Sequence, residues 1–203
     1  MGSNFMENNM KKIALLLALV ALPTLANANV VVNGSFEADA QSAGTWNILS
    51  LTGWTGSAEL RNNVAGTASD GVNFVELDTT GNSSIYQTFT GLSGLYNLSF
   101  DYSARPGVAK DSNPIQAWWN GALLTTVTGN GIGKSDNNWL TLDFLVSGTG
   151  NDKLTFTAAG ISDSLGGSLD NVILTAVPEP ETYGMLLAGL GLIGFVARRR
   201  RTD

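Results

Sequence analysis

The sequence of residues 29–176 predicts an all-β fold, a β-sandwich of the jelly-roll type. Apolar and polar residues alternate from Tyr96 to Ser103, which is the two-residue period of a half-buried strand. Glycine, asparagine and serine recur every ~8–15 residues, the spacing of turns between short strands. No window of this region carries an apolar stripe with the 3.6-residue period of a helix.

Several apolar segments have the length and pattern of strands: 72–77, 85–89, 96–102, 140–146, 154–158 and 172–174. Two further segments, 115–119 and 122–128, flank Asn120-Gly121, a dipeptide that strongly favours a two-residue hairpin turn. Trp54 and Trp139 are expected to be packing residues.

The composition of the region from Asn29 to Val177 excludes several classes of function. It holds 13 acidic and 5 basic residues, a net charge of −8, so it lacks the basic surface that nucleic acids require. The whole chain has neither cysteine nor histidine, which removes disulfides, the usual general base and the Ser-His triads. We therefore expect no catalytic residues; a glycan-processing enzyme that uses a pair of carboxylates is the catalytic alternative.

The N-terminal residues 1–28 have the pattern of an extension followed by a secretory signal peptide. Lys11 and Lys12 precede the apolar run 13–22, and Ala26-Asn27-Ala28 forms a cleavage site of the A-x-A type. The predicted mature chain begins at Asn29. Met10 is an alternative to Met1 as the start of translation.

The C-terminal residues 177–203 form a third segment. Pro178-Glu179-Pro180 is followed by the apolar stretch 183–197 and by Arg198, Arg199, Arg200 and Arg201. As a helix, this stretch would span roughly 22 Å, less than a bilayer core of about 30 Å. Together with the positive-inside rule, these features predict a weak membrane span that holds the chain temporarily, with its arginines in the cytoplasm.

This order of motif, apolar span and terminal arginines closely resembles the PEP-CTERM family of sorting signals. The resemblance implies that a membrane-embedded exosortase recognises the tail and removes it. It also implies export in a Gram-negative bacterium, with transient anchoring in the inner membrane and delivery to the cell surface or extracellular matrix. The tail is thus expected to act as an address, comparable to a removable anchor signal.

The middle of the chain resembles the galactose-binding-domain-like β-sandwiches, a group that includes many carbohydrate-binding modules. The segments that carry this resemblance are NGSFE (33–37), GW (53–54), DGVNFVELD (70–78), SIYQTFTGLSG (84–94), YNLSFDYSARPG (96–107), WNG (119–121) and SDSLGGSLDNVIL (162–174).

In related modules a structural Ca²⁺ lies between the first and last strands, and Glu37 and Asp170 occupy the matching positions. Asp170 shares strand parity with Val172 and Leu174, so it is expected to face the core, where an unpartnered carboxylate is costly. Calcium would supply the partner, with backbone carbonyls completing its oxygen shell. The alternative is that Asp170 caps a turn and Glu37 is solvated.

Strand parity also suggests a platform for a sugar ring. Trp118 and Trp119 are adjacent on the strand 115–119, so they must point to opposite faces. Trp119 shares its face with apolar residues and is expected to pack inward, which leaves Trp118 exposed to stack on a sugar. Asp101 and Arg105 lie on the polar face of the segment 96–107 and are candidates to bind sugar hydroxyls. The alternative is ordinary surface decoration.

These observations predict an exported, non-catalytic protein that binds polysaccharide and supports exopolysaccharide, biofilm or floc structure. A structural or adhesion module that contacts other proteins, without a glycan site, is the alternative.

Overall fold

The structure, a computed structural model, describes residues 28–178, 184, 187–191, 193 and 198. Several predicted processing residues lie outside this part of the chain: Ala26, Glu179, Pro180, Arg199, Arg200 and Arg201. Residues 187–191 of the apolar tail are helical. Among the residues described, no helix combines the length and apolarity needed to cross a membrane.

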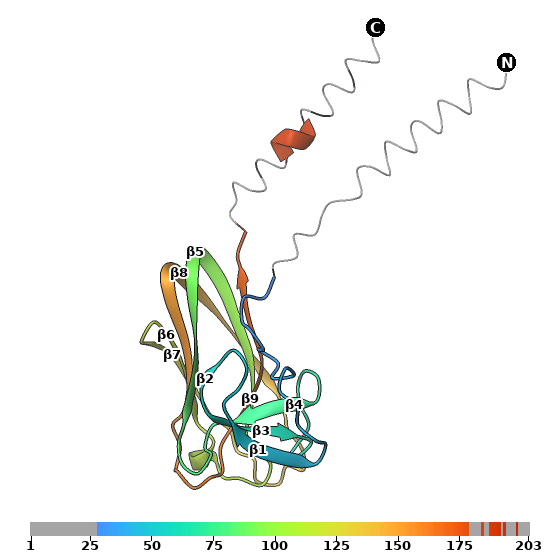
Figure 1. The fold of residues 1–203 in the computed structure, drawn as a ribbon, viewed down its shortest axis with the longest axis vertical. Helices are drawn as coiled ribbons and strands as arrows, with labels where there is room; N and C mark the ends of the chain where they lie inside the picture. The colour runs from blue at the N-terminus through green and yellow to red at the C-terminus, as the bar shows by residue number, and fades with distance from the viewer. Residues whose placement is uncertain (1–27, 179–183, 185–186, 192, 194–197, 199–203) are drawn as a thin grey trace, which may run out of the picture.

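The described strands form one antiparallel sheet (Figure 1), which confirms the predicted all-β class. They are β1 (Thr45–Leu49), β2 (Thr55–Gly56), β3 (Ala58–Asn62), β4 (Asn73–Glu76), β5 (Ser84–Ser103), β6 (Ile115–Trp119), β7 (Ala122–Val127), β8 (Leu140–Ala158) and β9 (Ser168–Ala176), with a short helix, η1 (Lys110–Ser112), between β5 and β6. The order across the sheet is β1-β3-β4-β9-β5-β8-β6-β7, and β2 pairs with β5 off this path.

The predicted hairpin turn is also confirmed. Asn120 and Gly121 join β6 to β7 with φ angles of 51° and 80°. Two consecutive positive φ angles are those of the type I′ turn that Asn-Gly favours.

The long strands β5 and β8 curl this sheet until its two halves face each other. They pair along nearly their whole length, and the register slips between Thr90 and Ser93. Gly91 lies in this slip with a φ of 76°, a conformation that side chains disfavour. The sequence predicted separate strands at 85–89 and 96–102, whereas the chain bends between them without ending the strand.

The curl produces two packed layers. The β1 layer contains β1, β3, β4 and β9 with residues 93–103 of β5 and 140–149 of β8. The β6 layer contains β2, β6 and β7 with residues 84–90 of β5 and 151–158 of β8. Phe100 of the first layer meets Phe156 of the second with 4.9 Å between ring centroids, so the core lies between the layers.

Connecting segments cover the outer face of the β1 layer. Phe74 lies on this face because its neighbour Val75 points into the core, yet Phe74 is fully buried. Its ring packs edge-on against Trp139 at 5.8 Å, and the Trp139 indole N–H donates to the Thr67 carbonyl at 3.0 Å. The packing role expected for Trp139 is confirmed, as is that of Trp54, which is buried in the core.

A bulge in β9 changes the predicted orientation of Asp170. Leu174 lies opposite Leu98 in the core, but the register slips by one residue before Asp101 meets Asp170. Asn171, with a φ of 49°, is the extra residue. Asp170 therefore lies on the outer face of the β1 layer with Asp101, and the expectation that it faces the core was wrong. It is buried nonetheless, because a connecting segment covers it.

Both ends of the domain lie at its bent end (Figure 1). The Val30 amide donates to the Leu174 carbonyl at 2.9 Å, and the Val177 amide donates to the Leu95 carbonyl at 2.8 Å. The Asn29 side chain accepts a hydrogen bond from the Leu174 amide. The chain therefore enters the domain after the predicted cleavage point, Ala28, and leaves it at Pro178, where the sorting tail begins. These two points lie close together at the bent end.

We expect Trp119→Ala to lower the free energy of unfolding by about 3–5 kcal/mol, because it leaves a cavity in the core. The Trp119 ring stacks on Phe89 at 6.0 Å between centroids, and its N–H donates to the Ser147 carbonyl at 3.0 Å. Trp118 is only partly buried, so Trp118→Ala should cost ~1 kcal/mol or less. Denaturant unfolding followed by circular dichroism measures both values. If Trp118→Ala lowers the free energy of unfolding more than Trp119→Ala does, then Trp118 is the core residue and Trp119 the exposed one.

Candidate functional site

The outer face of the β1 layer carries an unusual number of buried charges. Five ionisable side chains on this face are each less than 5% exposed: Glu59, Arg61, Glu76, Asp101 and Asp170. Charged side chains are rarely buried unless they are paired. The composition of β3, with Glu59 and Arg61 on one face, resembles that of a solvated segment, which is why the sequence did not predict this strand.

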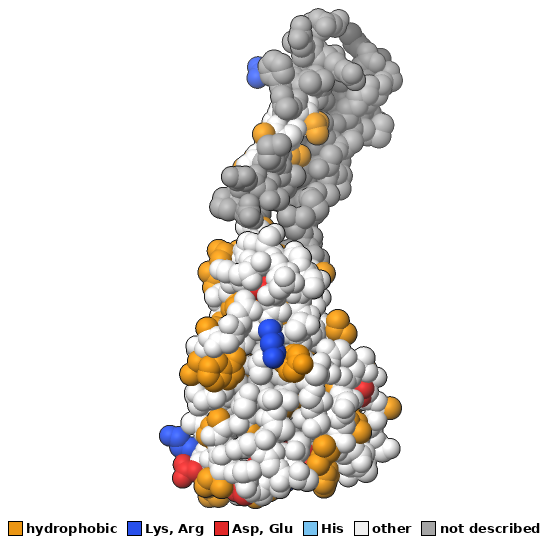
Figure 2. All heavy atoms as spheres, turned by 60° about the vertical axis from the view of Figure 1, so that its left-hand side comes forward, with side chains coloured by type: hydrophobic (Ala, Val, Ile, Leu, Met, Phe, Trp, Pro, Cys, Tyr) orange, Lys and Arg blue, Asp and Glu red, His pale blue; other side chains and the backbone are white. Residues whose placement is uncertain are grey.

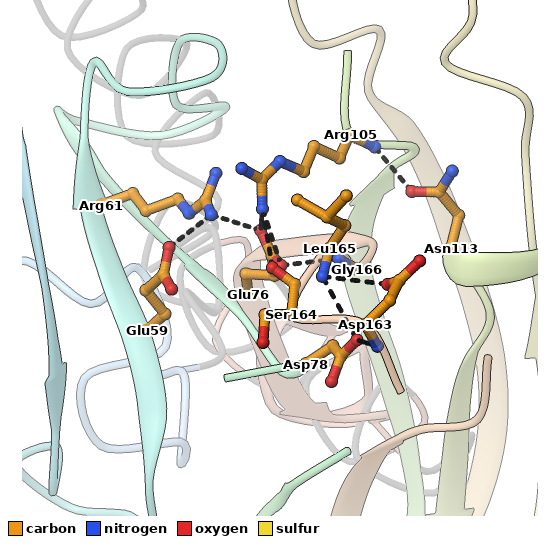
Figure 3. Close-up of polar contacts among 10 residues, drawn as sticks. All are labelled: Glu59, Arg61, Glu76, Asp78, Arg105, Asn113, Asp163, Ser164, Leu165 and Gly166. Atoms are coloured by element: carbon orange, nitrogen blue, oxygen red, sulfur yellow. Dashed lines mark hydrogen bonds and ion pairs between the residues drawn. The ribbon is translucent and has the colours of Figure 1, made fainter. Parts of the chain in front are cut away.

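Two glutamates and two arginines form a buried ion-pair cluster (Figure 3). Arg61 contacts both Glu59 and Glu76, with 2.6 Å between its Nη2 and the Glu76 Oε2. Arg105 reaches the same Glu76 carboxylate through Nη1, at 2.9 and 3.1 Å. Burial raises the pKa of Glu76 to about 7, although the positive charges of Arg61 and Arg105 oppose this rise.

This cluster fastens the segment 163–166 to the sheet (Figure 3). The Gly166 amide donates to the Glu76 carboxylate at 2.6 Å, and Arg105 Nη1 donates to the Ser164 carbonyl at 3.3 Å. One Asp78 oxygen accepts hydrogen bonds from the amides of Asp163 and Leu165. The Glu76 and Asp78 carboxylates thus stabilise a loop rather than form a site open to a ligand.

Glu37 and Asp170 bind two ends of one short segment, 69–73. The Asp170 Oδ2 accepts hydrogen bonds from the amides of Ser69 and Asp70 at 2.7 and 2.9 Å. The Glu37 Oε1 accepts hydrogen bonds from the amides of Val72 and Asn73 at 2.8 and 2.6 Å. Asp170 thus has the capping role that was the alternative to calcium binding. Glu37 is exposed, as that alternative expected, but its carboxylate also caps the segment.

These contacts give the carboxylates of Glu37 and Asp170 partners other than a cation. Three of the four carboxylate oxygens accept backbone amide hydrogens, since the second Asp170 oxygen accepts from the Asn171 amide at 2.7 Å. Within the described residues, no three side chains of metal-binding type converge. Calcium stays a prediction, but the structure gives Asp170 other partners.

The residues predicted to bind sugar lie in three different places. Trp118 is partly buried on the β6 layer, opposite Thr155 of β8. Asp101 is buried under the segment 66–72, where it accepts hydrogen bonds from Ser69 and Asn171. Arg105 belongs to the ion-pair cluster. The structure therefore does not bring Asp101 and Arg105 together beside Trp118.

The outer face of the β6 layer carries a row of partly buried side chains instead. Trp118 of β6, Thr155 of β8 and Tyr86 of β5 occupy directly opposed positions on three neighbouring strands. The Lys153 ammonium lies 3.7 Å from the centroid of the Tyr86 ring, a cation–π contact. Leu123, 47% exposed, pairs with Trp118 across the hairpin. Figure 2 views the molecule from the side of β6 and β7 and shows hydrophobic side chains beside a basic one.

A cleft of about 220 Å³ lies between the end of β5 and the connection from β7 to β8. Seven of the ten residues that line it have polar side chains; the lining residues are Tyr102, Ser103, Ala104, Thr128, Gly129, Asn130, Lys134, Asp136, Asn138 and Leu140. Beside the cleft, the connection from β7 to β8 approaches the segment after β5 closely at Gly131, where a Cβ atom would lie 1.8 Å from the Arg105 carbonyl oxygen, so this position requires glycine. The polar side chains among these residues make the cleft a second place where a hydroxylated ligand would find hydrogen bonds.

Residues 176–201 match the model of the PEP-CTERM protein-sorting motif. The C-terminus therefore carries this motif, as its resemblance predicted. The motif implies export, sorting and processing by an exosortase.

The remaining comparisons concern the domain. The chain is 28% identical over 156 residues to the multifunctional-autoprocessing repeats-in-toxin of Vibrio cholerae serotype O1. The matched region is 73% of this chain and 3% of that protein. It thus spans about 3% of the length of this curated relative.

Solved structures that are similar to this one include two carbohydrate-binding modules. A family 35 carbohydrate-binding module from Clostridium thermocellum has a TM-score of 0.45 and 18% identity, covering 66% of this chain and 100% of that module. TmCBM61, in complex with beta-1,4-galactotriose, has a TM-score of 0.46 and 18% identity, covering 74% and 99% of the two chains.

The buried carboxylates predict how stability depends on pH. Burial raises the pKa of Asp170 to about 7, as it does for Glu76. An acid whose pKa is raised in the folded state stabilises the fold fully below its unfolded pKa, and this contribution is lost as the pH rises through the folded pKa. We expect the melting temperature to fall from about pH 5 to pH 8 by ~2 °C or more.

The control for this prediction compares how steeply the melting temperature changes with pH, rather than the melting temperatures themselves. Asp170→Asn cannot ionise, so its melting temperature should change less over this pH range than that of the unaltered protein. Asp143→Asn replaces an exposed carboxylate and should leave the slope unchanged. Equal slopes in all three proteins would show that Asp170 does not titrate in this range.

Chelation tests calcium separately. Because amide hydrogens occupy three of the four carboxylate oxygens of Glu37 and Asp170, we expect the melting temperature in excess EDTA to equal that in excess Ca²⁺. A bound ion would instead stabilise the fold by about 2.7 kcal/mol at a hundredfold excess over its Kd. A chelator-induced fall that Asp170→Asn abolishes would restore the calcium site, and differential scanning calorimetry measures it.

Proposed function

We propose that this protein is exported, sorted through its C-terminal motif, and binds polysaccharide at the cell surface or in the extracellular matrix without catalysing a reaction. The curled sheet then belongs with the galactose-binding-like sandwiches of jelly-roll type. In this role the protein supports the exopolysaccharide of a biofilm or floc.

The observation that carries the glycan assignment is the row of Trp118, Thr155 and Tyr86. Neighbouring strands lie ≈ 4.7–4.9 Å apart, so the two aromatic residues are separated by about 10 Å. Aromatic faces stack on the apolar faces of sugars, and a row of this length suits an oligosaccharide better than one ring. Lys153 and Thr155 supply polar groups between and beside the rings.

Sorting follows from the motif and from the position of the two ends. We propose that the chain is held briefly in the inner membrane of a Gram-negative bacterium and is then cut near Pro178-Glu179-Pro180. Because both terminal segments leave from the bent end of the domain, that end faces the membrane during anchoring. The cleft at the opposite ends of β5 and β8 then points away from the membrane.

A structural or adhesion module is the second candidate. The observation that favours it is β1, an edge strand whose Trp46 is 50% exposed and whose Ile48 is 40% exposed. This role is compatible with glycan binding because β1 and Trp118 lie on different layers.

Mass spectrometry of protein recovered from the culture matrix tests the sorting. We expect peptides from the domain, but none from residues 10–28 and none that contain Arg198 to Arg201. Full-length tail peptides in extracellular material would contradict removal of the tail.

Retention on the host exopolysaccharide tests the glycan site. We expect Trp118→Ala to reduce retention about fivefold or more, because loss of one stacked ring weakens binding by about 1–3 kcal/mol where stacking has been measured on other ligands. Asn138→Ala, at the cleft, is the matched control and should retain binding. Loss of retention in the cleft variant alone would move the site to the cleft, and no binding by the unaltered protein would reject the proposal.

A further inference from the structure

Strand β1 is the open edge of the β1 layer. It pairs with β3 on one side and ends the strand order of the described sheet. Every residue from Thr45 to Ile48 is exposed, including the large side chains of Trp46 and Ile48. Exposed strand edges offer unpaired backbone groups to another strand.

The features that usually protect such an edge are missing from β1. No charged residue and no proline occurs from position 40 to position 58, although the domain as a whole is strongly acidic. The five pairs between β1 and β3 follow one another without a slip. The other edge of the sheet differs, because the pairing of β6 with β7 has a bulge between Ala117 and Trp118, and bulges turn an edge away from a partner strand.

The partner that fits this edge is a second copy of the same strand. Antiparallel pairing about a two-fold axis through Asn47 places Trp46 of one copy opposite Ile48 of the other, twice. Both side chains lie on one face of β1, since they are two residues apart. Thr45 then lies opposite Leu49 of the second copy. The sequence of β1 thus complements itself in a register that pairs apolar residues.

Electrostatics favours the same contact. Two acidic domains repel each other over most of their surfaces, and this repulsion is weakest at β1, which lies within an uncharged stretch of 19 residues. A strongly charged partner would find no opposite charge in this stretch.

We infer that β1 pairs with β1 of a second copy, which joins two β1 layers into one continuous sheet. The contact is short, so it belongs with weak interfaces that bury less than about 1,200 Å². It becomes populated where the protein is concentrated, and it does not depend on the proposed glycan binding.

Cysteine trapping tests this register directly, because the chain has no cysteine of its own. Opposed residues of antiparallel strands have Cα atoms about 4.5–5.5 Å apart, within disulfide range. In the full chain exported under oxidising conditions, Asn47→Cys should form a disulfide-linked dimer on a non-reducing gel. Thr45→Cys alone should not, but a mixture of Thr45→Cys and Leu49→Cys chains should.

Leu123→Cys, exposed on the other edge strand, is the control for random collision. Equal cross-linking at positions 45, 47 and 123, or none at 47 in a variant with an unchanged melting temperature, would overturn the proposal. A second measurement uses no cysteine: Ile48→Lys should reduce the dimer seen by sedimentation at least tenfold while leaving retention on polysaccharide unchanged. If retention fails in the unaltered protein but the dimer forms, only the glycan assignment fails.

Discussion

Hydrogen bonds from backbone amides to carboxylates hold the connecting segments of this domain in place. Three buried acids, Asp78, Asp152 and Asp170, each accept two or more such bonds. A fourth, Glu76, combines one such bond with its ion pairs. Loss of one of these acceptors would leave buried amides without partners, which is costly. In a chain without cysteine, these carboxylates take the part that disulfides play in other exported domains.

This arrangement gives the acidic composition a structural cause. Most acids of the domain accept hydrogen bonds from its own loops, so the net charge of −8 is no sign of a basic ligand. It also decides which surfaces are free. The segments held by Asp170 and Glu76 cover much of the outer face of the β1 layer, which leaves the outer face of the β6 layer, the cleft and the edge at β1 for contacts with other molecules.

Much of the fold could be predicted from local patterns, because alternation along a strand survives in three dimensions wherever the pairing is regular. The opposite orientations of Trp118 and Trp119 followed from parity, since β6 pairs with β8 without a slip. The same argument failed for Asp170, because the extra residue Asn171 interrupts the alternation, and Asp170 therefore points to the opposite face from the one that parity predicts. The residues around position 171 carry no sequence signal that would predict a bulge here rather than at any other Asp-Asn pair.

The candidate site was harder to predict, because its partners are distant in sequence. Arg105 and Asp101 are polar residues on a strand, and the sequence offers a glycan or solvent as their partner. The structure offers Glu76, 29 positions away from Arg105, and Asn171, 70 positions away from Asp101. Only the curl of β5 and β8 and the order of β3, β4 and β9 bring these residues together, and strand order is set by the packing of the whole sheet.

The row at Trp118 and the edge at β1 lie on opposite layers, so occupation of one does not block the other. Each contact is weak by itself: a few stacked rings in one case and a single short strand in the other. When a second copy is bound through β1, however, two rows belong to one rigid sheet, and the second contact with a polysaccharide becomes intramolecular. The gain depends on geometry rather than on new interactions, and it disappears if the two rows cannot reach the same polymer network. If the tail is removed as proposed, this coupling of two weak contacts is a physical means of holding the protein in a matrix.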